Sequence, residues 1–266
     1  MRKYGQHIII WLVLAFLYLP ILILTFYSFT SSTMIGSVRE FSFDNYITLF
    51  TEPALRSMMF GTLSLAVAVA LISMLLGSVG AIGAFYSKKG IRRTVEFFNQ
   101  VPVVNADVVT GFSICIFMIV LLHMDKDTYI PLVIAQTALC TPFVYLSVTP
   151  RLKMMDNSLY EAALDLGCSP AQALRKVVLP QIRPGIISGF LTAVTLSLDD
   201  YFIATYTKPA TFDTISTYVV NATRGAQTSI KTALWALSAV MFIIVVAVVM
   251  AANIRRNDGK EEDLRI

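Results

Sequence analysis

The chain has 266 residues, of which 56% are hydrophobic and only 14% are charged. Soluble globular domains have roughly 25% charged residues, so this composition excludes an ordinary water-soluble enzyme. The net charge of +4 is spread over short segments between long apolar stretches. It therefore does not indicate a nucleic-acid partner.

Six almost wholly apolar stretches, each of about 21 to 29 residues, are long enough to cross a bilayer. They are Ile8–Phe29, Met58–Tyr86, Val101–Leu122, Tyr129–Thr149, Pro184–Tyr206 and Thr232–Ile254. The sequence thus predicts an all-α, polytopic membrane protein with six transmembrane helices. The first stretch follows Arg2 and Lys3 and precedes no small-residue cleavage site, so we expect it to be retained as a helix.

The basic residues predict the orientation of the chain. With the N-terminus in the cytosol, fifteen of the 21 Lys and Arg residues fall in inner segments and six in outer ones. Cytoplasmic loops of membrane proteins carry the excess of Lys and Arg. We therefore expect a multi-pass protein of the cell (plasma or inner) membrane, surrounded by lipid, with both termini cytoplasmic.

This topology divides the chain into three parts. Residues 1–56 hold the first transmembrane helix and an external segment, and residues 255–266 form a cytosolic tail. Residues 57–254 hold a core of five transmembrane helices, including a long cytosolic loop at 150–183. The three cysteines and two histidines are scattered along the chain, so neither a disulfide framework nor a metal site is expected.

The long cytosolic loop carries the signals of two short helices joined by a bend. The four residues Ser158–Glu161 match a capping box that would start the first helix. Gly167 can take the left-handed backbone that ends it. Ser169 and Pro170 suit the start of a second helix, which Pro180 should stop. Such a unit is either a linker packed under the membrane helices or a knob that inserts into a partner.

A series of fixed spacings runs through the same loop: Glu161-Ala162-Ala163, three residues, Gly167, nine residues, and Val177-Val178-Leu179-Pro180. This series resembles the EAA loop of the permease subunits of ATP-binding-cassette (ABC) importers. The family pattern is E-A-A, three residues, G, nine residues and I-x-L-P, and this chain has Val in place of its Ile. The resemblance extends over about Ser57–Ala252 and implies the type I ABC importer permease fold.

The resemblance also implies partners. In that family the loop docks in a groove of an ATPase subunit and transmits its movement. The positions implied to couple in this way are Glu161, Ala162, Ala163, Gly167, Leu179 and Pro180. One second permease subunit of similar fold, two ABC ATPase subunits and an extracytoplasmic substrate-binding protein are implied as well. The chain has no Walker A sequence, so it is not expected to be an enzyme or to hold a cofactor, and ATP and Mg²⁺ belong on the ATPase subunits.

Three acidic residues lie inside the predicted spans, where no Lys or Arg occurs: Asp107 in the third span, and Asp199 and Asp200 in the fifth. An Asp at the centre of a membrane helix costs about 2.5–3.5 kcal/mol and marks a substrate or ion path. Acids without a counter-ion indicate that a cation passes. For Asp107, capping of an irregular helix start is the alternative.

Helical periodicity separates the two neighbouring aspartates of the fifth span. One face is polar, then acidic, then aromatic, with Ser188, Thr192, Thr195, Asp199, Phe202 and Tyr206. The next face begins with two small residues and carries Gly189, Ala193, Leu196, Asp200 and Ile203. We expect the first face to line a path and the second to contact a helix. Asp199 is thus the predicted substrate contact, although Asp200 could line a wide cavity from its other side.

The depths of the acids in the membrane can also be predicted. Asp199 would lie about 22 Å from the cytosolic end of its helix, in the outer half of the bilayer. Asp107 is only six residues into a helix that enters from the cytosol. The two acids would be separate stations along a path for an elongated polycation.

Ser197-Leu198-Asp199-Asp200 and Asp107-Val108-Val109 resemble segments of the second permease subunit of polyamine (spermidine/putrescine) importers. This resemblance implies ATP-driven import of polyamines. The EAA loop also occurs in importers of other small solutes, which leaves such a substrate as an alternative. A proton-coupled secondary transporter could use the aspartates, but it has no ATPase for the loop to dock on. An intramembrane aspartyl protease needs Tyr-Asp and Gly-x-Gly-Asp, and both are absent.

Overall fold

The computed structural model describes residues 2–30, 40–125, 127–224 and 235–240, and the single positions 242, 243, 246 and 250. These residues are mainly helical, and their only β structure is one isolated bridge between Thr30 and Phe41. They belong to two compact units, which are described one at a time. The larger unit contains residues 60–217, and the smaller contains the described residues of 2–59 and 218–247.

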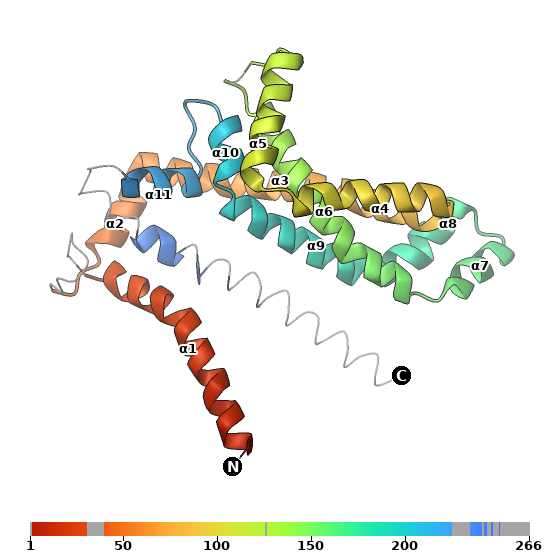
Figure 1. Cartoon of the computed structure of the whole chain (residues 1–266), viewed down its shortest axis with the longest axis horizontal. Coiled ribbons are helices and arrows are strands. Elements are labelled where there is room, and N and C mark those ends of the chain that lie inside the picture. The colour runs from red at the N-terminus through yellow and green to blue at the C-terminus, as the bar shows by residue number, and fades with distance from the viewer. Residues whose placement is uncertain are drawn as a thin grey trace. The chain divides into compact units, whose positions relative to one another are not determined.

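The helices and their bounds follow in chain order (Figure 1). They are α1 (Arg2–Ser28), α2 (Asp44–Thr51), α3 (Pro53–Tyr86), α4 (Lys89–Val104), α5 (Asp107–Ile116), α6 (Ile130–Met154), α7 (Asn157–Asp165), α8 (Pro170–Ala173), α9 (Leu179–Asp199), α10 (Phe202–Thr207) and α11 (Ile215–Arg224). Two π-helical turns, η1 (Phe117–Leu121) and η2 (Leu174–Val178), extend α5 and join α8 to α9.

Several of these helices can cross a membrane. Within the described ranges, four segments are long and apolar enough: Ile9–Ser28, Pro53–Tyr86, Ile130–Met154 and Pro170–Asp199. A fifth span results if α4 and α5 with η1 count as one broken span. The predicted sixth span, Thr232–Ile254, lies mostly outside the described residues, as does the predicted tail 255–266. The all-α, polytopic architecture predicted from the sequence is confirmed.

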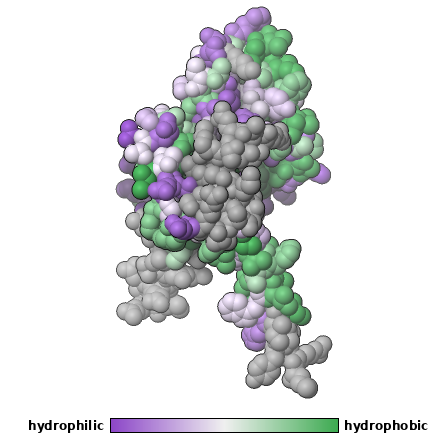
Figure 2. Space-filling model, turned by 90° about the vertical axis from the view of Figure 1, so that its left-hand side faces the viewer, coloured by the Kyte–Doolittle hydropathy of each residue, from purple (hydrophilic) through white to green (hydrophobic). Residues whose placement is uncertain are grey.

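In the smaller unit, α1 exposes its hydrophobic side chains along its length, which Figure 2 shows. Trp11 and Phe16 are 71% and 79% exposed. An apolar surface of this length is suited to lipid. The C-terminal end of α1 is tied to α2, because the Asn45 side-chain amide donates to the carbonyl oxygens of Ser28 and Thr30 at 3.0 Å each.

The core of the larger unit lies between α3, α6 and α9. Figure 1 shows α6 and α9 running side by side. At their contact, a Cβ added to Gly189 would lie only 3.0 Å from the Val144 side chain, so the two helices approach closely there. Ala193, one turn farther along α9, is fully buried. The predicted packing face of Gly189 and Ala193 is therefore confirmed.

The predicted third span, Val101–Leu122, is wrong as a continuous helix. It begins inside α4 and turns by 106° between α4 and α5. Asn105 and Ala106 are extended at the turn, and the Asn105 side-chain amide donates to the Thr110 hydroxyl at 3.0 Å. This bond between two side chains links the turn to the first helical turn of α5.

The prediction that Pro180 stops the second helix of the loop 150–183 is also wrong. The helix continues from Pro170 through η2 and α9 to Asp199. In η2 the Leu179 amide donates five residues back, to the Leu174 carbonyl oxygen. A proline interrupts a regular α-helix because it lacks an N–H and crowds the carbonyl of the preceding turn. The wider π-turn just before Pro180 changes the hydrogen-bond register at this point.

Candidate functional site

The fifth predicted span is broken at its acidic pair. The helix α9 ends at Asp199, the backbone of Asp200 is extended (φ −67°, ψ 112°), and α10 begins at Phe202. The expected single helix Pro184–Tyr206 is therefore wrong. The break falls at the residues that the sequence marked as functional.

The side chain of Asp200 causes this break. Its Oδ1 accepts from the Ile203 amide and its Oδ2 from the Ala204 amide, both at 3.0 Å. The carboxylate thus satisfies the first amides of α10, which in a continuous helix would bond to backbone carbonyls. A negative charge at the start of a helix is also favoured by the helix dipole.

Asp200 is anchored to α6 as well. Its side chain is buried, and Oδ2 accepts from Nε2 of Gln136 at 2.9 Å. Asp200 therefore lies on the packed side of the helix, as periodicity predicted, and a buried carboxylate of this kind needs its hydrogen bonds. It does not line a cavity opposite Asp199.

Asp199 and Thr195 lie on the opposite, exposed face of α9. The Thr195 hydroxyl donates to the Leu191 carbonyl oxygen at 3.0 Å, so it is bonded within its own helix. Of the two ion pairs found in the described residues, Arg92 with Glu96 and Lys208 with Asp213, neither involves Asp199. Thr195 and Asp199, on the face predicted to line a path, are therefore not packed against other helices of the larger unit.

Asp107 lies nearer to the acidic pair than the sequence predicted. It is the first residue of α5, and α5 packs beside α10 (Figure 1). A Cβ on Gly111, one turn into α5, would lie 2.9 Å from the Ile203 Cα. Asp107 is near enough to Asp200 for their charges to interact. The predicted separation assumed a straight helix through residues 101–122, and the bend before Asp107 removes that premise.

The capping alternative for Asp107 is not what the structure shows. Ala106 occupies the cap position of α5, and no side chain caps the helix. Asp107 is exposed in the first turn, where the helix dipole favours a carboxylate. One negative patch therefore contains the exposed Asp107 and Asp199, with the buried Asp200 behind its surface. Within the described residues, no group of three or more His, Cys, Asp or Glu side chains has a metal-binding arrangement.

Phe202 and Tyr206 do not continue the face of Asp199, because the break intervenes. Phe202 is 45% exposed, whereas the Tyr206 ring is half-buried and contacts Phe112 edge to face, with ring centroids 5.6 Å apart. The Cys115 thiol donates to the Tyr206 carbonyl oxygen at 3.1 Å. The two aromatics share one face of α10, and α5 holds that short helix in place.

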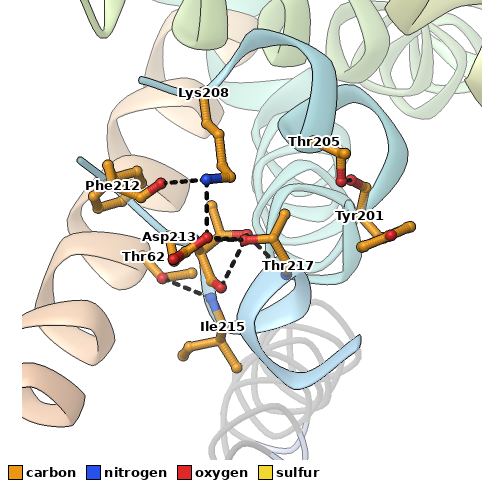
Figure 3. Close-up of polar contacts among 9 residues, drawn as sticks. Thr62, Tyr201, Thr205, Lys208, Phe212, Asp213, Ile215 and Thr217 are labelled. Carbon is orange, nitrogen blue, oxygen red and sulfur yellow. Dashed lines mark hydrogen bonds and ion pairs between the residues drawn. The ribbon is translucent and has the colours of Figure 1, made fainter. Parts of the chain in front are cut away.

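The segment after α10 is folded back by polar contacts, which Figure 3 shows. Lys208 Nζ donates to the Phe212 carbonyl oxygen and pairs with Asp213, each at 2.9 Å. The Ile215 amide donates to the Thr62 hydroxyl of α3 at 3.1 Å. Lys208, the basic residue closest in sequence to the acidic pair, is therefore already neutralised and is not its counter-ion.

The loop 150–183 contains a helix cap that differs from the predicted one. The cap of α7 is Asp156, whose carboxylate accepts from the Ser158 amide at 2.9 Å. The capping box predicted at Ser158–Glu161 is wrong, since those residues already lie inside α7. Asp156 takes the role because it precedes the helix with an extended backbone, from which its carboxylate accepts from a free amide of the first turn.

The hydrogen bonds from Ser158 hold the pKa of Asp156 below its usual value. Its contribution to α7 is therefore fully present above the usual Asp pKa and is lost as the pH falls through the lowered one. Asp156→Ala should speed amide hydrogen exchange in residues 157–165, whereas Asp156→Asn should stay close to wild type because Asn also caps helices. Equal exchange in all three proteins would show that the cap is unimportant.

The end of α7 follows the prediction. Gly167 has a φ of +85°, the left-handed conformation expected of it. The Gly167 amide donates to the Leu164 carbonyl oxygen at 2.9 Å, and the Cys168 amide to that of Ala163 at 3.0 Å. These two bonds form a Schellman motif. Ser169 then caps α8, with Pro170 in its first turn, as the sequence predicted.

Most of the predicted coupling residues of the loop are exposed, and one of them is buried. Glu161 and Ala162 are exposed, whereas Ala163 is buried toward the core. The Tyr160 ring packs on Tyr86 at the end of α3, with centroids 4.9 Å apart. Leu179 and Pro180 are exposed at the start of α9. The loop is therefore packed against the larger unit at Tyr160 and Ala163 and exposed at Glu161 and Ala162. Figure 1 shows α7 far from α10 within the larger unit.

Two polar residues of the membrane helices were missed from the sequence. Gln136 is fully buried in α6 and bonds to Asp200. Glu96 was assigned to a loop but lies in α4, where it pairs with Arg92 at 3.1 Å. A lone polar residue in an apolar stretch was the available signal for Gln136. Glu96 was missed because the predicted third span began at Val101, whereas the helix that contains Glu96, α4, begins at Lys89.

Comparison with known proteins identifies the family. The profile of the family described as "binding-protein-dependent transport system inner membrane component" matches residues 77–255. The chain belongs to this family. It is therefore a multi-pass membrane subunit of a transporter rather than an enzyme, which decides against an aspartyl protease and a secondary carrier.

Curated relatives cover most of the chain. It is 32% identical to the putrescine transport system permease protein PotI of Escherichia coli (strain K12), over 84% of this chain and 81% of that protein. It is 26% identical to the spermidine/putrescine transport system permease protein PotC of Haemophilus influenzae, over 97% of this chain and 99% of that protein.

Solved structures share the fold. A chain from the crystal structure of a bacterial ABC transporter involved in the import of the acidic polysaccharide alginate matches with a TM-score of 0.70 and 20% identity, covering 95% of this chain and 99% of that one. A chain of the MetNI methionine ABC transporter matches with a TM-score of 0.59 and 18% identity, over 76% and 95%. The type I importer permease fold implied by the EAA loop is thereby confirmed.

Proposed function

We propose that this chain is a permease subunit of an ABC importer that carries polyamines into the cytoplasm. The observation that carries the proposal is the negative patch of Asp107, Asp199 and Asp200, in which Asp199 is exposed. No ion pair in the described part of the chain neutralises these three residues. Exposed carboxylates without an ion-pair partner suit a small polycation.

The relatives support this substrate class, because permeases for putrescine and for spermidine with putrescine are among them. The structural neighbours include importers of an acidic polysaccharide and of methionine, so the fold itself does not select the substrate. The acids do. Attraction between a carboxylate and an ammonium group is stronger in a partly desolvated site than in water.

The proposed assembly contains one second permease of similar fold, two ABC ATPase subunits that bind ATP and Mg²⁺, and an extracytoplasmic substrate-binding protein. Both termini of this chain would be cytoplasmic. The loop 150–183 would dock on an ATPase through the exposed Glu161 and Ala162. Buried Ala163 and the left-handed Gly167 would fix the shape of α7, and Leu179 and Pro180 would carry movement into α9.

The test is to purify the complex with its co-expressed neighbouring subunits and to measure ATP hydrolysis with the substrate-binding protein present. Spermidine or putrescine should stimulate hydrolysis, whereas a neutral sugar of similar size should not. Stimulation by another solute alone would assign this chain to an importer of that solute. Absence of any ATPase subunit from the purified complex would overturn the assembly.

The aromatics of α10 give a prediction about the approach to Asp199. An aromatic face can hold an ammonium ion, worth about 0.5–2 kcal/mol depending on desolvation. Tyr206→Leu should weaken polyamine-stimulated ATP hydrolysis more than basal hydrolysis, with both rates normalised to complex yield because the Tyr206 ring also packs on Phe112. Tyr206→Phe should be tolerated, because it keeps the ring that packs on Phe112. If Phe is damaging and Leu harmless, the hydroxyl matters rather than the ring.

A further inference from the structure

We propose that Gln136 is a positioning residue: its side-chain amide clamps the chain on both sides of Asp199 and so fixes that carboxylate in the path. The role in transport rests on the proposed function. The clamp itself is a property of the fold and can be tested without any polyamine. Gln136 would not touch the substrate, because it is fully buried in α6.

Both ends of the amide are used. Gln136 Nε2 donates to Asp200 Oδ2 at 2.9 Å, and Oε1 accepts from the Ser197 hydroxyl at 2.8 Å. Ser197 lies two residues before Asp199, and Asp200 one residue after it. One side chain from a different helix therefore holds the backbone on either side of the exposed carboxylate.

The neutral Gln136 side chain also suits a position beside the buried carboxylate of Asp200. The partners of the Asp200 carboxylate in the structure are all donors: the amides of Ile203 and Ala204 and the amide nitrogen of Gln136. A buried carboxylate is stable only with such donors, and Asp107 adds a like charge nearby. A glutamate at position 136 would add another negative charge, and an apolar residue would remove a donor. The neutral amide both donates to Asp200 and accepts from Ser197, which neither alternative does.

Loss of the clamp should change where Asp199 points. Without Gln136, Ser197 and Asp200 each lose a buried hydrogen bond, which is costly for both. The break between α9 and α10 is set by Asp200, and one residue of helix rotates a side chain by about 100°. A small change at the break is therefore enough to turn Asp199 away from its exposed position.

The direct test measures the accessibility of position 199. In a chain with Cys115, Cys140 and Cys168 replaced by Ser, Asp199→Cys is labelled in the assembled complex by a cationic methanethiosulfonate reagent. Gln136→Met keeps the length of the side chain and removes both hydrogen bonds, so the labelling rate should fall by about five-fold. The matched control is Gln100→Met, in exposed Gln100 of α4, which should leave the rate unchanged.

An exchange of the two partners separates positioning from substrate contact. When Gln136→Glu is combined with Asp200→Asn, the oxygen of the new amide at position 200 can still accept from the Ile203 amide, whereas the Ala204 amide loses the acceptor that Oδ2 provided. Its nitrogen can donate to the new carboxylate at position 136, which also accepts from Ser197. The double variant should therefore recover part of the labelling at position 199 and part of the complex yield, relative to Gln136→Glu and Asp200→Asn alone. With Asp199 in place, Gln136→Met should raise the KM for polyamine-stimulated hydrolysis more than it lowers kcat.

Unchanged labelling and KM in Gln136→Met would overturn the proposal. So would a double variant as defective as its worse parent, because the charge at Asp200 would then matter rather than the geometry. If Gln136→Met fails to assemble, the shorter amide in Gln136→Asn replaces it, and labelling as fast as in wild type would again count against the clamp. Labelling that responds as expected in a complex that ignores polyamines would keep the clamp and reject the proposed substrate.

Discussion

Asp199→Asn should reduce polyamine uptake by about tenfold or more, because the change removes charge and keeps shape. Two unit charges 4 Å apart attract by about 4 kcal/mol at an effective dielectric of 20, so the loss of one carboxylate is large even after partial screening. The exposed position of Asp199 on α9 makes folding insensitive to the substitution. Uptake of radiolabelled spermidine and putrescine by cells, normalised to the amount of complex in the membrane, measures the effect.

Three further variants serve as comparisons for Asp199→Asn. Asp199→Glu should retain a substantial part of uptake, because the charge remains. Thr195→Val, one turn away on the same exposed face, should change uptake little, since its hydroxyl bonds within α9. Asp200→Asn should lower the amount of assembled complex, because Asp200 is buried and anchors α10. Wild-type uptake in Asp199→Asn would remove this residue from the path.

Local signals explain what could be predicted from the sequence. The long apolar stretches of α1, α3 and α6 need no tertiary information, because length and hydropathy suffice for a membrane span. The turn at Gly167 was equally local, since a residue without Cβ at the end of a short helix favours the left-handed backbone. The separation of Asp199 from Asp200 by helical periodicity also held, because both residues follow the uninterrupted part of α9.

The breaks were not predictable by the same reasoning, because each involves a specific side-chain hydrogen bond. Asn105 at the end of α4 bonds to Thr110, and Asp200 stops α9 by bonding to the amides that follow it. The anchor of Asp200, Gln136, lies 64 residues away in the sequence. Periodicity continues a helix through such positions by default. It therefore placed Phe202 beside Asp199 and moved Asp107 away from the acidic pair.

Gly167→Val should uncouple transport from ATP hydrolysis at the opposite end of the larger unit. Gly167 has a φ of +85°, and left-handed backbone costs a residue with a Cβ roughly 1–2 kcal/mol. A β-branched side chain there would unwind the Schellman motif that orients the exposed tip of α7. We expect the variant to reach the membrane, to lose transport, and to retain less ATPase subunit when the permease is pulled down.

Steric crowding does not complicate this test, because no atom lies within 4 Å of a Cβ added at Gly167. Any effect of valine therefore comes from the backbone. Asparagine tolerates the left-handed region better than other residues, so Gly167→Asn should recover much of the ATPase binding. Gly90→Val is the matched control, since a Cβ at this position in α4 also meets no atom within 4 Å and the backbone needs no left-handed conformation. Equal transport and equal ATPase recovery in Gly167→Val and Gly90→Val would exclude the bend from the coupling mechanism.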